Sequence, residues 1–196
     1  MAFRGERYET LRVIASGGMA TVHLGRALGA GGFERLVAIK VMHPHLAGEP
    51  EFVAMFLDEA RLAARIRHPN VVGTLDIQQD DDGLFLVMEL VEGPSLSHLL
   101  KGLAKQGGKL PIEVALRIGL DLLAGLHAAH EPTGPDGEPL RLIHRDMSPH
   151  NVLVGADGIS KITDFGVARA ESRLATTRTG SVKGKVMYMP PEQVRS

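Results

Sequence analysis

The chain has 196 residues, 44% of them hydrophobic and 23% charged, so it is long enough to bury a core and does not have the composition of a disordered or fibrous protein. Its formal net charge of -1 provides no broad positive field, which argues against bulk binding to nucleic acid or to an anionic membrane. The absence of cysteine excludes disulfides and thiolate metal sites and fits a reducing, cytoplasmic compartment, and no stretch approaches the roughly 20 apolar residues that span a bilayer.

The first half of the chain predicts a unit rich in strands. Short segments with alternating apolar residues are bounded by turn residues, which is typical of antiparallel strands. The Gly-rich turn Ser16-Gly17-Gly18-Met19 joins the first two, and the acidic turn at 79–83 is typical of a solvated hairpin tip. The expected strands are 8–15, 21–28, 36–42, 71–77 and 84–90.

One helix is expected within this first half, at 51–67, where the apolar residues have helical spacing. Glu59 interrupts the apolar stripe of this helix, and a buried carboxylate needs a cationic partner to offset its desolvation. Lys40, on the preceding strand, is the candidate partner. Between them, His43-Pro44-His45 favours a strand-to-helix loop over a metal site, because no third ligand is spaced to join the two histidines.

The second half of the chain predicts a mainly helical unit. Helices are expected at 96–103 and from about Pro111 to 130, because Pro is well placed as a first helical residue. A surface loop at 131–139 follows, and the short apolar runs beyond it predict strands. Those strands are 142–144, 151–154 and 159–163. Strands followed by helices are typical of an α+β protein, here with domains at 1–92 and 93–196.

Three motifs in fixed order carry the chemistry. His144-Arg145-Asp146 is followed by Asn151, and Asp164-Phe165-Gly166 begins thirteen residues after Asn151. With Val37-Ala38-Ile39-Lys40 and the Glu59 helix upstream, this arrangement resembles the catalytic and metal-binding loops of eukaryotic-like, bacterial Hanks-type serine/threonine protein kinases over residues 8–196. The resemblance implies a two-lobe α+β fold, with a β-rich N-lobe that carries one regulatory helix and an incomplete, mainly helical C-lobe. It also implies transfer of the γ-phosphoryl group of ATP, with Mg²⁺, to Ser/Thr hydroxyls of protein substrates in signalling.

The same resemblance assigns roles to five residues. Lys40 is expected to bind the α- and β-phosphates, with Glu59 orienting its ammonium group; a purely structural Lys–Glu pair is the alternative. Asn151 and Asp164 supply hard oxygen ligands, which suit Mg²⁺. Asp146 is expected to orient the attacking hydroxyl as a positioned base, a role worth roughly 10² to 10⁴ in rate.

A nucleotide slot is also implied. The family pattern G-x-G-x-x-G-x-V meets alanine at two of its three glycines, which should stiffen the turn and affect nucleotide affinity rather than the fold. The stretch 84–93 resembles the hinge between the lobes, with Met88 as gatekeeper and the backbones of Glu89 and Val91 on the adenine edge. The residues expected to contact ATP are Ala15, Ser16, Gly17, Gly18, Met19, Ala20, Val22, Ala38, Lys40, Met88, Glu89, Val91 and Leu153.

Two departures from the family pattern occur together. Ser148 stands where Ser/Thr kinases have a lysine two residues after the catalytic aspartate, and Lys185 stands where they have a threonine. We expect Lys185 to supply the transition-state cation that Ser148 cannot, because charge on the transferring phosphoryl must be stabilised.

Arg145 directly precedes the predicted catalytic aspartate. In this the chain resembles kinases whose activation segment is ordered when an added phosphate pairs with such an arginine. A flexible polar loop is the alternative for the same stretch. The candidate phosphorylation sites are Thr176, Thr177, Thr179 and Ser181.

The family fold continues beyond Pro190-Pro191-Glu192, whereas four residues remain in this chain. We therefore expect a chain truncated from a larger kinase, with Val152, Leu153 and the apolar face of the long helix partly exposed to a missing C-terminal segment or a dimer partner. The rival hypothesis is a non-catalytic, kinase-like binding module. Five retained residues favour the enzyme, because a binding module would need none of them. They are Lys40, Glu59, Asp146, Asn151 and Asp164.

Overall fold

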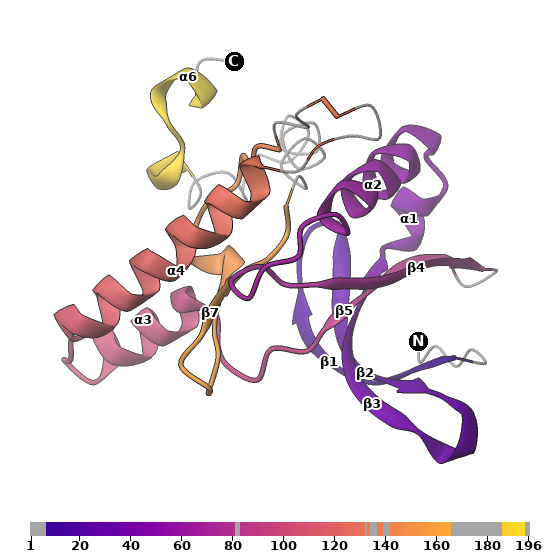
Figure 1. The fold of residues 1–196 in the computed structure, drawn as a ribbon, viewed down its shortest axis with the longest axis horizontal. Helices are drawn as coiled ribbons and strands as arrows, with labels where there is room; N and C mark the ends of the chain where they lie inside the picture. Colours follow the sequence, from indigo (N-terminus) through magenta and orange to yellow (C-terminus); the bar gives the residue numbers. More distant parts are fainter. Residues whose placement is uncertain are drawn as a thin grey trace. The chain divides into compact units, whose positions relative to one another are not determined.

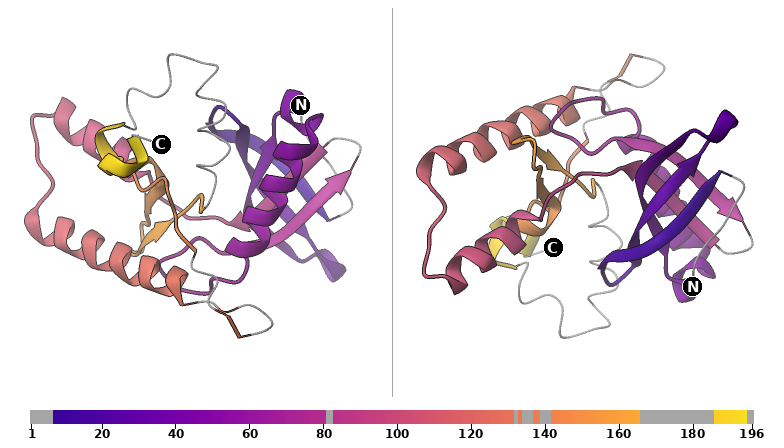
Figure 2. Two further views of the ribbon diagram at one scale, coloured as in Figure 1. Left: turned by 90° about the horizontal axis from the view of Figure 1, so that it is seen from above. Right: turned by 90° about the horizontal axis from the view of Figure 1, so that it is seen from below.

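The computed structural model describes residues 7–80, 83–131, 133, 137–138, 142–165 and 186–194, and it divides the chain into two compact units. One unit consists of the chain up to Ala64 together with Gly73–Leu90, and the other consists of Arg65–Val72 together with the chain from Val91. Figure 1 and Figure 2 show the strands that dominate the first unit and the two long helices of the second.

The first unit is built on a five-stranded antiparallel sheet with the strand order β1-β2-β3-β5-β4. The predicted strand at 71–77 begins later, at Thr74, because Val71 and Val72 pair with Ile162 in the second unit instead. The short helices η1 and α1 and the longer α2 complete the unit. The element bounds are β1 Tyr8–Ser16, β2 Ala20–Leu28, η1 Ala30–Gly32, β3 Glu34–Met42, α1 Pro44–Ala47, α2 Pro50–Ala63, β4 Thr74–Asp80 and β5 Gly83–Glu89.

Both faces of this sheet bury apolar side chains, but only one described face carries the buried Lys40. Successive residues of a strand point to opposite faces, so the cross-strand register decides which side chains share a face. One face carries the core cluster of Tyr8, Val37, Ile39, Phe85 and Val87. The register pairs of the other face are Val22↔Lys40, Lys40↔Leu86 and Ala38↔Met88. This second face also buries Met42 and Leu84, so Lys40 lies among apolar neighbours there.

The second unit contains the helices α3 and α4 and a two-stranded antiparallel sheet of β6 and β7. Pro111 is the N-cap of α4 rather than its first residue, with ψ of 143°. The predicted strand at 142–144 is wrong: no strand is assigned there, and Ile143 is 61% exposed, so this short apolar run has no ladder to join. The element bounds are α3 Leu96–Lys105, α4 Ile112–His130, η2 Pro149–Asn151, β6 Val152–Val154, β7 Ser160–Ile162, η4 Val186–Tyr188 and α6 Pro191–Val194.

Part of the predicted apolar exposure is present. Val152 is only 1% exposed, contrary to expectation, because it pairs with Ile162 inside the β6–β7 hairpin. Several apolar side chains of α4 are exposed. They are Ile112, Val114, Leu116, Leu120 and Leu123. Within the described residues, no helix is long and apolar enough to cross a membrane.

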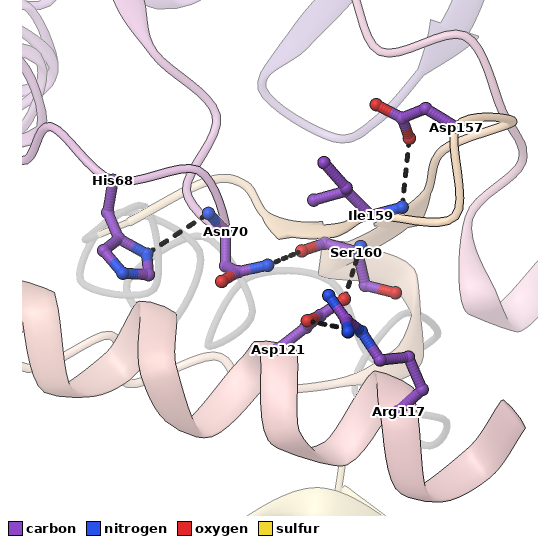
Figure 3. Close-up of polar contacts among 7 residues, drawn as sticks. All are labelled: His68, Asn70, Arg117, Asp121, Asp157, Ile159 and Ser160. Atoms are coloured by element: carbon purple, nitrogen blue, oxygen red, sulfur yellow. Dashed lines mark hydrogen bonds and ion pairs between the residues drawn. The ribbon is translucent and has the colours of Figure 1, made fainter. Parts of the chain in front are cut away.

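The segment Arg65–Val72 belongs to the second unit because polar bonds attach it to β7. The Ile162 amide donates to the Asn70 carbonyl at 2.9 Å, and the Val72 amide donates to the Ile162 carbonyl at 2.8 Å. The Asn70 side-chain amide also donates to the Ser160 carbonyl at 2.9 Å, as Figure 3 shows. These bonds satisfy buried backbone groups that would otherwise destabilise the unit.

Asp121 attaches β7 to the long helix α4. Its carboxylate accepts the Ser160 amide at 2.8 Å and pairs with the Arg117 Nε at 3.0 Å, one helical turn away (Figure 3). Asp121 is buried, and these two contacts offset the cost of removing its charge from water. One turn further on, Gly125 allows the helix to approach the Asn70 backbone: a Cβ there would lie 2.7 Å from the Asn70 carbonyl oxygen.

Two glycines of α4 should respond in opposite directions to alanine. Gly125→Ala is expected to destabilise the chain by about 1–3 kcal/mol, because its methyl group meets the Asn70 backbone. At Gly119 a Cβ would have no atom within 4 Å, so Gly119→Ala is expected to stabilise the chain by about 0.5–1 kcal/mol because alanine favours the helix more than glycine does. Urea unfolding of both variants measures the difference; two equal shifts would contradict the close packing of α4 on Asn70.

Candidate active site

Lys40 lies in the middle of β3, on the sheet face opposite the core cluster. It is only 8% exposed, and its register partners are Val22 on β2 and Leu86 on β5. Ala38 and Met88, a second register pair, lie on the same face. Four residues predicted to contact ATP therefore share one surface of the first unit. A buried ammonium requires a polar or anionic counterpart. Glu59 lies on α2 of the same unit, but its side chain is outside the described part of the structure, so the Lys40–Glu59 pair stays a prediction.

The Gly-rich turn closes between β1 and β2. Ser16 pairs with Thr21, and the Gly17 amide donates to the Ala20 carbonyl at 3.0 Å. Ala15 and Ala20 replace two glycines of the family pattern without backbone strain: within the described residues, the only non-glycine residues with positive φ are Arg145 and Asp164. The turn therefore does not need the left-handed conformation that alanine disfavours.

The predicted hinge segment, residues 84–93, is flanked by hydrogen bonds in both units. In the first unit, the Glu89 amide donates to the Gly73 carbonyl at 2.9 Å, and the Gly73 amide donates to the Glu89 Oε1 at 2.7 Å. Since its amide is engaged, Glu89 can contact an adenine only through its carbonyl.

In the second unit, the chain that follows Val91 runs beside β6. Ser95 bridges to Leu153, and the Val154 amide donates to the Pro94 carbonyl at 2.9 Å. Gly93 makes this approach possible, since a Cβ there would collide with the Val154 carbonyl oxygen. Leu153, predicted to contact the adenine ring, is thus positioned by the hinge segment.

Asp146 and Asn151 are joined directly. The Asn151 Nδ2 donates to the Asp146 carbonyl at 2.8 Å and to the Asp146 Oδ2 at 2.9 Å. Asn151 is buried, and its own amide donates to the Ser148 carbonyl at 3.0 Å within η2. The Asn151 side-chain nitrogen faces Asp146, so its oxygen points away from that carboxylate and is the atom that could coordinate a cation.

His144 ties this loop to the segment before Asp164. Its Nδ1 accepts the Asp146 amide at 3.3 Å, and its Nε2 lies 2.9 Å from the Thr163 carbonyl. A backbone amide must donate and a carbonyl must accept, so the imidazole is neutral with its proton on Nε2. The ring is 2% exposed and stands 4.7 Å from the Phe165 ring. Burial lowers the pKa of His144 below its usual value, and this outweighs the opposing effects of the Thr163 carbonyl and of Asp146.

Asp164 follows a residue that is bonded to Asn151. The Thr163 amide donates to the Asn151 carbonyl at 3.0 Å, which extends the β6–β7 pairing by one step. Both predicted metal ligands therefore emerge at the same end of this hairpin. Asp164 has a φ of 60° and Arg145 a φ of 62°, both in the left-handed region that non-glycine residues rarely adopt. Strained residues of this kind cluster at functional sites.

Two supports of the catalytic loop were not predicted from the sequence. The Gln193 Nε2 on α6 donates to the Arg145 carbonyl at 2.7 Å, and the His150 Nε2 lies 3.0 Å from the Ser97 hydroxyl on α3. Neither belongs to a periodic pattern, so only their positions next to Glu192 and Asn151 could have drawn attention to them.

Five predicted residues lie outside the described part of the chain. They are Lys185, Thr176, Thr177, Thr179 and Ser181. In the part that is described, no group of three or more His, Cys, Asp or Glu side chains is arranged to hold a metal ion.

Comparison with known proteins gives one consistent result. The family described as the protein kinase domain matches residues 8–196. A protein of Myxococcus xanthus named tyrosine-protein kinase MasK is 48% identical over 188 residues, which are 96% of this chain and 29% of that protein. Serine/threonine-protein kinase PrkC of Bacillus subtilis is 38% identical over 189 residues, or 96% of this chain and 27% of PrkC. The chain thus spans less than a third of either relative.

A solved structure agrees with these sequence relatives. The crystal structure of the Mycobacterium tuberculosis PknI kinase domain superimposes with a TM-score of 0.63 and 27% sequence identity. The match covers 84% of this chain and 61% of that one.

The neutral His144 should make stability depend on pH. Its pKa is lower in the folded chain than in the unfolded chain, so the unfolded chain binds more protons as the pH falls below about 6.5. The contribution of His144 is therefore complete above that pH and is lost as the pH falls towards the folded-state pKa. Urea unfolding between pH 7.5 and 5.5 should show a steeper loss in the parent than in His144→Gln; equal slopes would contradict a buried, neutral imidazole.

Proposed function

Because the chain belongs to the protein kinase domain family, as the sequence motifs predicted, we propose that it transfers the γ-phosphoryl group of ATP to serine or threonine hydroxyls of protein substrates. One observation carries the proposal: the Asn151 side chain holds the Asp146 carboxylate, while the Asn151 backbone holds the segment that leads into Asp164. A fixed carboxylate beside two oxygen donors is what positioned phosphoryl transfer requires.

Asp146 is the proposed base. The hydrogen bond from the Asn151 Nδ2 to its Oδ2 and the bond from its own amide to His144 restrict both its side chain and its backbone. A carboxylate restricted in this way can accept a hydrogen bond from an incoming hydroxyl group and orient its oxygen towards a phosphorus atom.

The donor set at this end of the β6–β7 hairpin fits Mg²⁺. The Asn151 Oδ1 and the Asp164 carboxylate are hard oxygen donors, and Mg²⁺ takes one or two such protein ligands when phosphates and water complete its shell. When bound, the ion neutralises charge on the phosphates. Asn151 and Asp164 would hold it, and the His144 bond to Thr163 would keep their two segments in register.

We propose that residues 1–92, which include the whole first unit, form the ATP-binding lobe and that residues 93–196 form the catalytic lobe. Val22, Ala38 and Met88 offer an apolar surface for an adenine ring, and Lys40 offers a cation for phosphates on the same sheet face. We propose that the Gly-rich turn, Val91 and Leu153 contact the same nucleotide and that Glu59 orients Lys40. A cytoplasmic location, where ATP is available, is part of the same proposal.

The acceptor residue is the finer part of the proposal. PrkC is named a serine/threonine kinase, whereas MasK is named a tyrosine kinase and is more similar in sequence. Phosphoamino-acid analysis of a labelled generic acceptor and of the chain itself separates the two. Phosphoserine or phosphothreonine is expected, in the chain itself among Thr176, Thr177, Thr179 and Ser181. Phosphotyrosine alone would refute the serine/threonine assignment.

Asp146→Asn should lower label transfer from γ-labelled ATP by roughly 10² to 10⁴ while leaving binding of MgATP within about twofold, because the substitution removes the base and keeps the size of the side chain. Glu113→Gln, an exposed residue of α4 with the same change in charge, is the matched control and should transfer label at the parent rate. A parent chain that binds MgATP without transferring label would instead support the non-catalytic binding module.

The buried hydroxyl of Ser148 supports a catalytic role for Lys185. The Ser148 side chain is 4% exposed, and its hydroxyl has no hydrogen-bond partner among the residues that the structure describes. A buried hydroxyl of this kind favours a polar partner from elsewhere. We propose that the Lys185 ammonium reaches Ser148 beside Asp146 and stabilises the charge on the transferring phosphoryl, in place of the lysine that Ser148 replaces.

Lys185→Met should lower kcat roughly 10²-fold with little change in nucleotide affinity, because it removes an interaction made in the transition state. Lys109→Met, an exposed lysine, is the control. The exchange Ser148→Lys combined with Lys185→Thr should recover part of the activity that Lys185→Thr loses. Equal turnover in Lys185→Met and the parent would refute this role.

A further inference from the structure

His43 uses its side chain in an unusual way for its position. It is the N-cap of α1, where its carbonyl accepts the Leu46 amide at 2.9 Å and the Ala47 amide at 3.2 Å. N-cap residues are normally Ser, Thr, Asp or Asn, whose side chains accept a further amide of the first turn. His43 makes no such side-chain cap. Its imidazole is therefore directed to another partner.

That partner is the Gly-rich turn between β1 and β2. The His43 amide donates to the Met19 carbonyl at 2.9 Å, and the His43 Nε2 lies 3.1 Å from the Thr21 Oγ1. The Thr21 hydroxyl also lies 3.5 Å from the Ser16 hydroxyl, a weaker contact at the limit of hydrogen bonding. Ser16 and Thr21 are register partners that flank the turn. With His43, which directly follows β3, they form a polar rung that runs from the end of β3 across β2 to β1.

The polar rung lies behind the turn and not on its nucleotide side. Thr21 is the register partner of Val41, whereas Val22 is the register partner of Lys40, and successive residues point to opposite faces. The rung therefore supports the turn without touching the face that carries Lys40. Lys40 lies in β3 and His43 directly follows the last residue of β3. This strand therefore links Lys40, the proposed phosphate-binding cation, to the residue that contacts the turn.

We propose that His43 is a positioning residue for the phosphates of the nucleotide: through the Met19 carbonyl and the Thr21 hydroxyl it holds the Gly-rich turn in the conformation that binds them. This inference rests on the proposed function. The turn lacks two family glycines and needs no positive φ, so a fixed conformation is compatible with its sequence. If the rung is removed, the turn samples other conformations. The apparent affinity for the nucleotide then falls in proportion to the fraction of molecules whose turn keeps the binding conformation.

Two substitutions remove the rung from opposite ends. His43→Leu removes the imidazole, and Thr21→Val removes the hydroxyl while keeping the branched side chain that suits a strand. Each is expected to weaken MgATP binding about 3- to 10-fold, the effect of one net hydrogen bond, and to leave adenosine binding within about twofold, because adenosine has no phosphate. The double variant should be no weaker than about the more affected single variant, since both remove one interaction.

Two controls separate positioning from a general loss of structure. Thr21→Ser keeps the hydroxyl and should bind MgATP as the parent does. His45→Leu changes the neighbouring exposed histidine, whose ring centroid lies 5.6 Å from that of His43, and should also match the parent. Amide hydrogen exchange of residues 16–20 without ligand should be faster in His43→Leu than in His45→Leu.

The outcomes distinguish this inference from the proposed function. Equal weakening of MgATP and adenosine, or unchanged MgATP binding in both rung variants, would refute a phosphate-positioning role for His43 while leaving the kinase proposal intact. A parent chain that binds neither ligand would refute the nucleotide site itself, and the role of His43 with it.

Discussion

The candidate active site depends on the two hydrogen bonds made by the neutral imidazole of His144. It accepts the amide of Asp146 on one side and donates to the carbonyl of Thr163 on the other. The two segments that it joins have no regular secondary structure at these residues, so their positions are set by side-chain bonds rather than by a ladder. Only the uncharged ring can make both bonds, and burial keeps it uncharged. Asp146, Asn151 and Asp164 owe their proximity to this one side chain and to the hairpin that follows it.

The two-residue period of the strands places the core cluster of the first unit and its proposed nucleotide surface on opposite faces of the sheet. Val37, Ile39, Phe85 and Val87 fill one face with a continuous core, which leaves the alternate residues of β3 and β5 for the other face. Lys40 can therefore be buried among apolar neighbours without interrupting the core. A shift of register by one residue would move the ammonium into the core cluster, so the core and the proposed site specify the same register.

Local patterns in the sequence predicted the long elements and the motifs, and the family and its α+β two-lobe fold are confirmed. The errors occur where distant polar partners decide the structure. Val71 and Val72 look like the start of β4, but Ile162 binds them, and 142–144 looks like a strand until His144 is seen to bond through its side chain. The role of Asp121 was not predicted, and His43 was predicted only as part of a loop. A side-chain hydrogen bond to a residue distant in sequence leaves no periodic pattern from which it could be predicted.

The two left-handed residues show why such polar support is needed. A non-glycine residue in this region costs about 1–3 kcal/mol, a sizeable part of the roughly 5–15 kcal/mol that stabilises a domain. Asp164 is of a type that tolerates the conformation, and Thr163 before it is bonded to Asn151. Arg145 is not of such a type, and its carbonyl is held by Gln193. Hydrogen bonds to other segments of the chain therefore offset the strain at Arg145 and beside Asp164, so the geometry around Asp146 depends on Gln193 as well as on the proposed site residues.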